Sequence, residues 1–397
     1  MIRKYDRKLV LENGTEITGY SFGAAGDKVL ELVFNTSMVG YQEIISDPSY
    51  TDQAVVMTYP LIGNYGMSDE DYESKRPSIG ALIVREYNDE PSSWRSDKTL
   101  GEVMEQFGIA GISGVDTRRL TRIIRETGSC KVLLTGSDRP LAEAVEYLKN
   151  TELRRDQVSR VSVKESYISE APDDIGSAGA DNTAGNGRIF NVVAIDCGMK
   201  LNIVRELNAH GCRVTVVPYD TAAEDIEALN PDGIFISNGP GDPMDAVPVI
   251  EAVKKLKGRY PMFGICLGHQ IISLAYGART YKLKFGHRGG NHPVMDTATG
   301  KIEMTSQNHS YAVDPDSLKD TGLTVTHVNL LDDTVEGMEC VKDRVFSVQY
   351  HPESAPGPCD SGYLFDRFTG LMSRTVAEES TANVRSMKCL KTHRSKE

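Results

Sequence analysis

The feature that most constrains the fold is a regular alternation of apolar and amphipathic segments between Arg188 and Ala278. Short apolar runs recur there, as in strands that are buried on both faces. They are "IFNVVAIDCG", "CRVTVVPYD", "DGIFIS" and "YPMFGI". Segments with helical spacing separate them, and the first of these ends at Gly211. The pattern predicts a mostly parallel, open α/β sheet with helices on both faces, and ligands bind beyond the carboxyl ends of such strands.

Composition and charge narrow the class of protein. The 397 residues are 40% hydrophobic and 25% charged, which is ordinary for a soluble globular protein of two or three domains. The formal net charge of −12 disfavours a nucleic-acid or anionic-membrane partner, because neutralising phosphates requires excess Lys and Arg. We find neither an apolar run of about 18 residues nor a signal-peptide core. Seven scattered cysteines without a CxxC pair favour a reducing, cytoplasmic location.

The chain divides by pattern into four segments. Residues 1–168 mix strands and helices, with a hairpin expected around Asn13-Gly14 and a helix from Thr117 that stops at Gly128. Residues 169–187, "SEAPDDIGSAGADNTAGNG", are small and polar and predict a flexible linker. Residues 188–374 form the α/β domain described above. Residues 375–397 are polar and charged, and we expect a mobile tail.

Cys266 lies in "PMFGICLGHQII", at the expected corner between a strand and a helix. Gly264 and Gly268 flank it and would let the backbone pack closely around an exposed thiol, as in a nucleophile elbow. The helix from about Leu267 would direct its N-terminus at the sulfur and favour the thiolate. A buried, inert cysteine is the alternative. Cys197 also ends a strand before a helix, but it lacks the paired glycines.

Two further motifs could complete a thiol-hydrolase site. The sequence "HPE" places His351 and Glu353 after the strand-like run "RVFSVQY". Because residues i and i+2 of an extended chain point to the same side, a base and its orienting carboxylate could lie side by side. The loop "SNGPGDP" follows another strand, and its backbone N–H groups could bind an oxyanion. A surface His beside a Glu, or a plain turn, would explain either motif alone.

Taken in order, "SNGPGDP", "GICLGHQ" and "HPE" resemble the glutamine amidotransferases that use a Cys-His-Glu triad. In the first domain, "VFNTSMVGYQEIISDPSY", "TYPLIGNYG" and "SGVDTRRLTRIIRE" are similar to the small, glutamine-hydrolysing subunit of carbamoyl-phosphate synthase. The segments "FGHRGGNHPV" and "TSQNHSYAVD" continue the resemblance in the second domain. It covers residues 1 to about 372 apart from the linker.

The resemblance implies roles for individual residues. Cys266 would be the nucleophile, His351 the base and then the acid, and Glu353 the group that orients His351. The oxyanion hole would use Gly239 and the amide of Leu267. The residues that would hold glutamine, or close over it, are Ser49, Gly241, Gln270, Asn308, Ser310 and Tyr311. Ser49 belongs to the first domain, so the site would lie at the domain interface.

One departure from the family pattern concerns Ser310. Many relatives read Asn-His-Gly-Phe where this chain reads Asn308-His309-Ser310-Tyr311. A serine can replace that glycine unless the position requires a positive φ. His269 is expected to pack rather than react, and His287 and His292 are expected to lie too far from any Cys or Asp cluster to form a metal site.

The resemblance therefore implies a glutaminase subunit that releases ammonia through a Cys266 thioester and passes it to a large synthetase subunit. That partner would make carbamoyl phosphate from bicarbonate for arginine and pyrimidine biosynthesis. No cofactor or metal is expected in this chain, since no P-loop motif occurs, and ATP and Mg would bind the large subunit. The alternatives are an independent thiol hydrolase, such as a γ-glutamyl peptidase, and a non-catalytic partner subunit. The amino-terminal domain disfavours an independent hydrolase, which would have no use for it. An intact triad disfavours a non-catalytic subunit.

Overall fold

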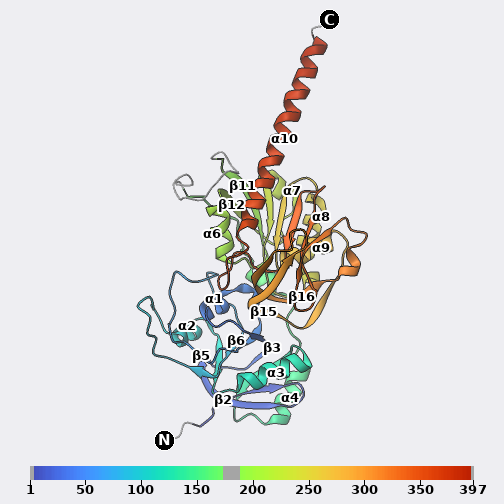
Figure 1. Ribbon diagram of the computed structural model, residues 1–397. Coiled ribbons are helices and arrows are strands. Elements are labelled where there is room, and N and C mark those ends of the chain that lie inside the picture. Colours follow the sequence, from blue (N-terminus) through green and yellow to red (C-terminus); the bar gives the residue numbers. More distant parts are fainter. Residues whose placement is uncertain (1–3, 173–187, 395–397) are drawn as a thin grey trace.

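The computed structural model describes residues 4–172 and 188–394. The polypeptide forms a barrel in its first part and a larger sheet with flanking helices in its second part (Figure 1). Helix α10 (Tyr363–Arg394) begins against the sheet and extends beyond the body of the protein.

Seven strands close the barrel in the order β1-β2-β8-β6-β4-β3-β9, with β1 paired to β9. The strands are β1 (Arg7–Leu11), β2 (Glu16–Gly23), β3 (Lys28–Asn35), β4 (Gln53–Met57), β6 (Ala81–Ile83), β8 (Ala110–Ser113) and β9 (Cys130–Gly136). A short separate pair, β5 (Leu61–Ile62) and β7 (Glu86–Tyr87), lies in the same part of the chain. We call β1 to β9 and their connections the barrel domain.

The barrel strands are apolar on both faces, and alternate residues pack in different clusters. Leu32 and Ala54 join the cluster that contains Leu120 of helix α3 (Thr117–Thr127). Val33 and Val55 join the cluster formed with the other helices of the domain. Those helices are α1 (Tyr41–Ser46) and α2 (Leu100–Phe107), while α4 (Leu141–Asn150) covers a smaller cluster with β1 and β9. The two-residue period of the strands thus explains why both faces are covered.

The second sheet has ten strands in the order β10-β12-β11-β13-β14-β19-β18-β17-β15-β16. Its five central strands, β12, β11, β13, β14 and β19, run parallel, and antiparallel strands extend it on both sides. The strands are β10 (Tyr167–Ser169), β11 (Phe190–Asp196), β12 (Cys212–Pro218), β13 (Gly233–Ile236), β14 (Met262–Ile265), β15 (Thr280–Asp296), β16 (Ile302–Val313), β17 (Thr324–Asn329), β18 (Val335–Cys340) and β19 (Val345–Val348).

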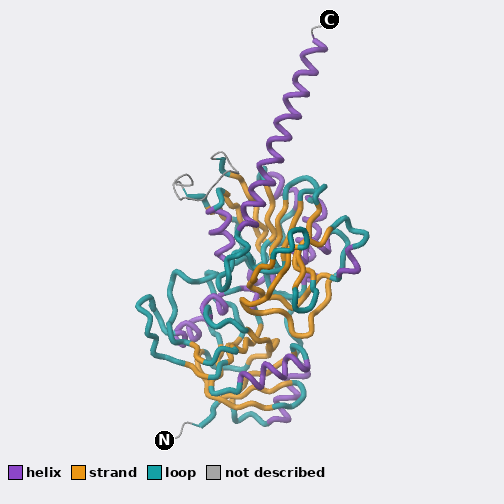
Figure 2. The backbone as a smooth tube through the Cα atoms, viewed as in Figure 1, coloured by secondary structure: helices purple, strands orange, loops and turns teal. Residues whose placement is uncertain are grey.

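Helices cover both faces of the parallel strands, as the tube in Figure 2 makes visible. On one face Val192 and Ala194 of β11 pack with apolar residues of α6 and α10, and on the other Val193 and Ile195 pack with α7, α8 and α9. The helices are α5 (Gln157–Val161), α6 (Leu201–Ala209), α7 (Ala223–Ala228), α8 (Val247–Leu256) and α9 (Leu267–Ala275), and single 3-10 turns lie at η1 (Pro48–Tyr50), η2 (Pro243–Asp245) and η3 (Pro315–Leu318).

The expected mixed α/β part followed by a parallel-sheet part is confirmed, including the hairpin of β1 and β2 and the helix that ends at Gly128. Two of the expected boundaries fall inside secondary-structure elements, one in a strand and one in a helix. Strand β10 spans residue 168 and pairs with β12, and α10 continues through residue 374. Of the expected linker, residues 173–187 lie outside the described residues. Within residues 4–172 and 188–394, no helix combines the length and apolarity that crossing a membrane requires.

Candidate active site

The thiol of Cys266 lies at the carboxyl end of β14, one residue before α9 begins. Its backbone has φ 54° and ψ −104°, a conformation that residues other than glycine rarely adopt. A Cβ on Gly268 would lie 2.2 Å from the carbonyl oxygen of Ile236, and one on Gly264 would lie 2.6 Å from Ile272 Cδ1. Only glycine therefore fits at the two flanking positions, and the strained corner between strand and helix is the elbow that the sequence predicted.

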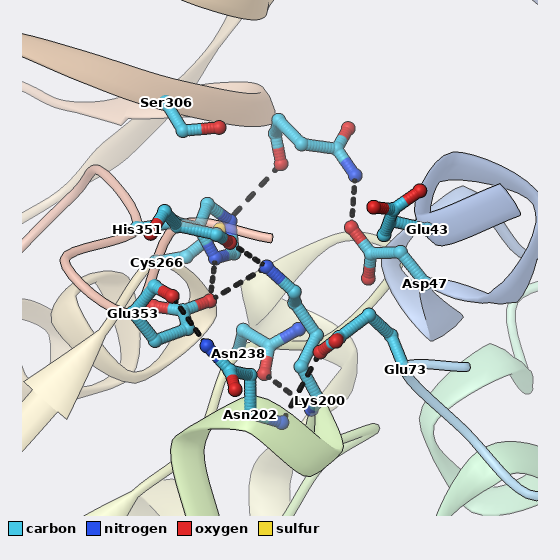
Figure 3. Close-up of polar contacts among 12 residues, drawn as sticks. Glu43, Asp47, Glu73, Lys200, Asn202, Asn238, Cys266, Ser306, His351 and Glu353 are labelled. Carbon is cyan, nitrogen blue, oxygen red and sulfur yellow. Dashed lines mark hydrogen bonds and ion pairs between the residues drawn. The ribbon is translucent and has the colours of Figure 1, made fainter. Parts of the chain in front are cut away.

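His351 and Glu353 lie beside Cys266 in the segment that follows β19 (Figure 3). Glu353 Oε1 is 2.6 Å from His351 Nδ1, so the two-residue spacing does bring the side chains together. Among the described residues, Nε2 of His351 has no hydrogen-bond partner. The imidazole is thus fixed through one nitrogen and leaves the other available for a reacting group.

The surroundings of His351 and Glu353 favour the charged form of both side chains. Burial would lower the pKa of His351, but the charges of Glu353 and Cys266 raise it to about 10. Burial would raise the pKa of Glu353, but Lys200 and His351 lower it to about 2. At neutral pH the ring therefore carries a proton and the carboxylate is charged.

Lys200 was not identified from the sequence, although it lies two residues after the predicted strand "IFNVVAIDCG". Its Nζ is 3.0 Å from Glu353 Oε1 and also donates to the carbonyl oxygen of Ser354. The residue is 2% exposed, and its backbone N–H donates to Asn238 Oδ1 over 3.1 Å. Burial works against its charge, but the charges of Glu353, Glu73 and Asp47 raise its pKa. Lys200 and His351 therefore share one carboxylate oxygen.

A cavity of about 240 Å³ opens onto Cys266 between the barrel domain and the sheet. Its lining includes most of the residues expected to contact glutamine: Ser49, Gly239, Gly241, Gln270, Asn308, Ser310 and Tyr311. Leu267 is buried next to the thiol as the first residue of α9, where a backbone N–H has no partner within the helix. The structure thus gathers at one edge of the sheet residues that are far apart in the sequence.

The barrel domain reaches this cavity through η1. Asn238 Nδ2 donates to Ser49 Oγ over 2.9 Å, and Asn308 Nδ2 donates to Asp47 Oδ2 over 2.9 Å. The backbone carbonyl of Asn308 also lies 3.6 Å from Cys266 Sγ. Asp47 and Asn238 were missed by the sequence analysis, because a polar residue that bridges two domains leaves no local pattern.

The loop after β13 requires glycine where it passes the thiol. A Cβ on Gly239 would lie 2.2 Å from the carbonyl oxygen of Cys197, and Gly241 has φ +90°. Gln270 is held at the cavity by donating to the carbonyl oxygen of Tyr311 over 2.8 Å. These contacts support an exposed backbone beside Cys266, as an oxyanion site needs.

Ser310 lies within strand β16, and its φ is not positive. The strain that would have demanded glycine at this position is therefore absent. Its Oγ accepts a hydrogen bond from Arg288 Nη2, and the buried guanidinium of Arg288 adds positive charge to the cavity. Arg288 was not singled out in the sequence.

Two other predicted residues lie away from the chemistry. Cys197 is fully buried, and burial raises the pKa of its thiol, so it stays protonated. His269 is also fully buried, and its Nδ1 lies 3.0 Å from Ser347 Oγ. Burial lowers the pKa of His269 to about 3, so the ring is neutral and packs in the core.

The expectation that His287 lies far from acidic residues is wrong. Its Nε2 is 2.8 Å from Asp332 Oδ2, and its Nδ1 is 3.6 Å from Glu336 Oε1. With His309, these side chains form a buried group whose potential ligand atoms lie within 4.8 Å of one another. Burial would lower the pKa of His287, but hydrogen bonds to Asp332 and Glu336 raise it to about 9. The contact between His287 and Asp332 is thus a charged pair that ties β15 to the segment between β17 and β18.

Sequence comparisons define the class of protein first. Residues 193–371 match the family described as "Glutamine amidotransferase class-I", and residues 9–134 match "Carbamoyl-phosphate synthase small chain, CPSase domain". The second part of the chain is therefore a class-I glutamine amidotransferase domain.

Whole-chain relatives define the family. The carbamoyl phosphate synthase small chain of Staphylococcus haemolyticus is 50% identical over 377 residues, which cover 95% of this chain and 99% of the relative. That of Fusobacterium nucleatum is 53% identical, covering 92% and 97%, and the pyrimidine-specific small chain of Bacillus subtilis is 49% identical, covering 94% and 97%. The chain belongs to the family of carbamoyl-phosphate synthase small chains.

Proposed function

We propose that this chain hydrolyses L-glutamine to glutamate and ammonia and supplies the ammonia for carbamoyl phosphate synthesis. The observation that carries the proposal is the buried set of Cys266, His351 and Glu353, whose thiol borders a cavity lined by residues of both domains. Family membership gives the set its substrate class. The thiol, the base and the orienting carboxylate are the parts that amide hydrolysis through a covalent intermediate needs.

In the first half-reaction, the thiolate of Cys266 attacks the side-chain carbonyl carbon of glutamine. The oxyanion that forms would accept hydrogen bonds from the backbone N–H groups of Gly239, in the loop after β13, and Leu267, at the elbow. The carbon–nitrogen bond then breaks, and His351 Nε2 gives its proton to the departing nitrogen. The products are ammonia and a γ-glutamyl thioester on Cys266.

In the second half-reaction, His351 is neutral and accepts a proton from a water molecule that attacks the thioester carbonyl. The carbon–sulfur bond breaks, glutamate leaves, and Cys266 returns to its thiolate form beside a protonated His351. Glu353 keeps Nδ1 of the ring as a donor throughout, so Nε2 does both proton transfers. General acid–base assistance of this kind is typically worth about 10² to 10⁴ in rate.

The glutamine contacts are part of the proposal. Ser49, Gly241, Gln270, Asn308, Ser310 and Tyr311 would hold the α-amino and α-carboxylate ends of the substrate, or close over it. The mixture of backbone groups, amides and hydroxyls along the cavity supports a small zwitterionic substrate. No metal is needed for these steps.

The partner is proposed to be a large carbamoyl-phosphate synthase subunit, which would carry the ATP and Mg sites and use bicarbonate. The barrel domain supplies little of the chemistry itself, so we propose that it provides much of the docking surface, including α3 with its run of arginines. We place the assembly in the cytoplasm, where the product would enter arginine or pyrimidine biosynthesis.

A single assay separates this proposal from its rivals. Glutamate release is measured from the full chain alone and with the large subunit, beside synthesis from added ammonia. Cys266→Ser should abolish glutamine use and leave ammonia-dependent synthesis, while Cys197→Ser, the matched control, should retain both. Equal loss of both activities in Cys266→Ser, or glutamine use by that variant, would contradict the assignment. Full turnover without the large subunit would favour an independent hydrolase.

A further inference from the structure

Glu73 is a buried carboxylate of the barrel domain that the proposed mechanism does not use. It lies in the connection between β5 and β6 and is 2% exposed. Its backbone N–H donates to Ser46 Oγ over 3.0 Å, which anchors it to the end of α1. Figure 3 shows its side chain directed toward Lys200, from the opposite side to Glu353.

Glu73 caps a helix that belongs to the other domain. Helix α6 begins after Lys200, and the Lys200 side chain makes no capping hydrogen bond. Instead, the carbonyl oxygen of Glu73 accepts from the N–H of Leu201 over 2.8 Å, and its Oε2 accepts from the N–H of Asn202 over 3.2 Å. A carboxylate at this position satisfies two otherwise unpaired N–H groups and interacts favourably with the helix dipole.

The capped turn of α6 holds the triad from behind. Lys200 Nζ contacts Glu353 Oε1 over 3.0 Å, and Asn202 Nδ2 donates to the carbonyl oxygen of Glu353 over 2.6 Å. Asn202, which donates its N–H to Glu73, and Lys200, toward which the Glu73 side chain is directed, therefore both contact Glu353, the residue that orients His351. The chain of contacts runs from the barrel domain through α6 to the catalytic base.

The charge of Glu73 matters because Lys200 and His351 compete for the same oxygen of Glu353. A lysine whose charge was balanced by Glu353 alone would draw that carboxylate toward itself and away from His351. A second carboxylate near Lys200 shares its charge and leaves Glu353 to hold the imidazole. The charged groups that face Glu73 are Lys200 just before α6, Arg205 within α6 and Glu353 after β19.

We propose that Glu73 is a positioning residue for the glutaminase, which orients the triad from the barrel domain through helix α6 and Lys200. It acts without touching glutamine, since it is not part of the cavity lining. The proposal rests on the glutaminase function proposed above. It makes the barrel domain part of the catalytic machinery, beyond a docking surface and the contact from Ser49.

The pKa of Glu73 makes the effect of its charge measurable. Burial raises this pKa, against the charge of Lys200 and the hydrogen bond from Asn202, to about 7. The carboxylate is then mostly neutral at pH 6 and mostly charged at pH 8. Wild type at pH 6 should therefore resemble the variant Glu73→Gln, which is neutral at every pH.

The test compares glutamate release by wild type and Glu73→Gln at pH 6 and pH 8, on the full chain alone and with its large subunit. Suppose that the protein with a charged Glu73 turns over tenfold faster than the protein with a neutral Glu73. A pKa of about 7 then gives a ratio of the wild-type rate to the Glu73→Gln rate of roughly nine at pH 8 and roughly two at pH 6. The loss should be in kcat, with little change in KM for glutamine. A role in hydrogen bonding alone, without any contribution from the charge of Glu73, would give the same ratio at both pH values.

Two further variants complete the design. Glu102→Gln is the matched control, because Glu102 is also a helix-capping carboxylate of the barrel domain, and it caps α2 by accepting from the N–H of Thr99 over 2.8 Å. It should stay within about twofold of wild type at both pH values. Glu73→Asp keeps the charge but shortens the reach to α6, so it should be slower than wild type and should keep the pH dependence of wild type.

The outcomes are distinct. An inactive wild type would overturn the proposed function, and with it the role of Glu73 in that function. An active wild type with a pH-independent ratio for Glu73→Gln, or with an unchanged kcat, would overturn the role of Glu73. If Glu73→Gln does not fold, Glu73→Asp with the full wild-type rate would overturn it as well.

Discussion

The substitution Gly268→Ala tests how tightly the elbow is built. The added Cβ would lie 2.2 Å from the backbone carbonyl oxygen of Ile236, about 1.2 Å short of an ordinary 3.4 Å contact. Because the obstacle is backbone of β13, relief requires that α9 moves away from the strand and takes Cys266 with it. Overpacking of this kind typically costs about 1–3 kcal/mol, and a 1 Å displacement of a reacting group can cost about 10²-fold in rate.

The assay is glutamate release together with the melting temperature of the purified chain. We expect kcat to fall about a hundredfold, and the melting temperature to fall by about 2–4 °C for each kcal/mol lost from the free energy of unfolding. Gly370→Ala is the matched control, since Gly370 lies within α10 and its nearest new contact would be Arg374 Nη1 at 3.8 Å. That variant should be as active as wild type and up to about 1 kcal/mol more stable, because alanine is the better helix former. A Gly268→Ala protein with wild-type rate and midpoint would refute the geometry of the elbow.

Two further predictions concern a buried histidine and the departure from the family pattern. The pKa of His269 is about 3 in the folded protein, against an ordinary value of 6.5. As the pH falls, the unfolded chain therefore binds a proton at His269 before the folded protein does. The free energy of unfolding should fall by about 1.4 kcal/mol per pH unit between pH 6.5 and pH 3. His269→Asn should flatten this dependence in denaturant titrations, and an unchanged slope would show that His269 is not its source. Ser310→Gly should leave a buried donor of Arg288 without a partner, at a cost of about 1–3 kcal/mol, and raise KM for glutamine more than it lowers kcat. An unchanged KM would show that Ser310 does not shape the substrate cavity.

The strand and helix pattern of the second part was predictable, because local apolar periodicity decides it. Strands β11, β13 and β14 lie where the sequence placed them, and so does the corner at Cys266. The closure of the barrel was not predictable in this way, because pairing β1 with β9 joins segments more than a hundred residues apart.

The residues of the candidate site could be predicted where they belong to short sequence motifs, and not where only tertiary contacts bring them to the site. Cys266, His351 and Glu353 each belong to a short segment with a recognisable local geometry. Lys200 and Glu73 have no such segment, and their position follows only from how α6 packs between two domains. The polar composition of residues 375–397 predicted a mobile tail, whereas helix α10 continues through residues 375–394.

The central claim is that Cys266 forms a covalent bond with the γ-carbonyl of glutamine. The most direct measurement is rapid acid quenching of the working protein with glutamine, followed by mass spectrometry of the peptide that contains Cys266. The account predicts that this peptide gains the mass of one γ-glutamyl group, that hydroxylamine removes it, and that Cys197 stays unmodified. Turnover of glutamine by a protein whose Cys266 never carries the group, under conditions in which the thioester is stable to the quench, would contradict the account.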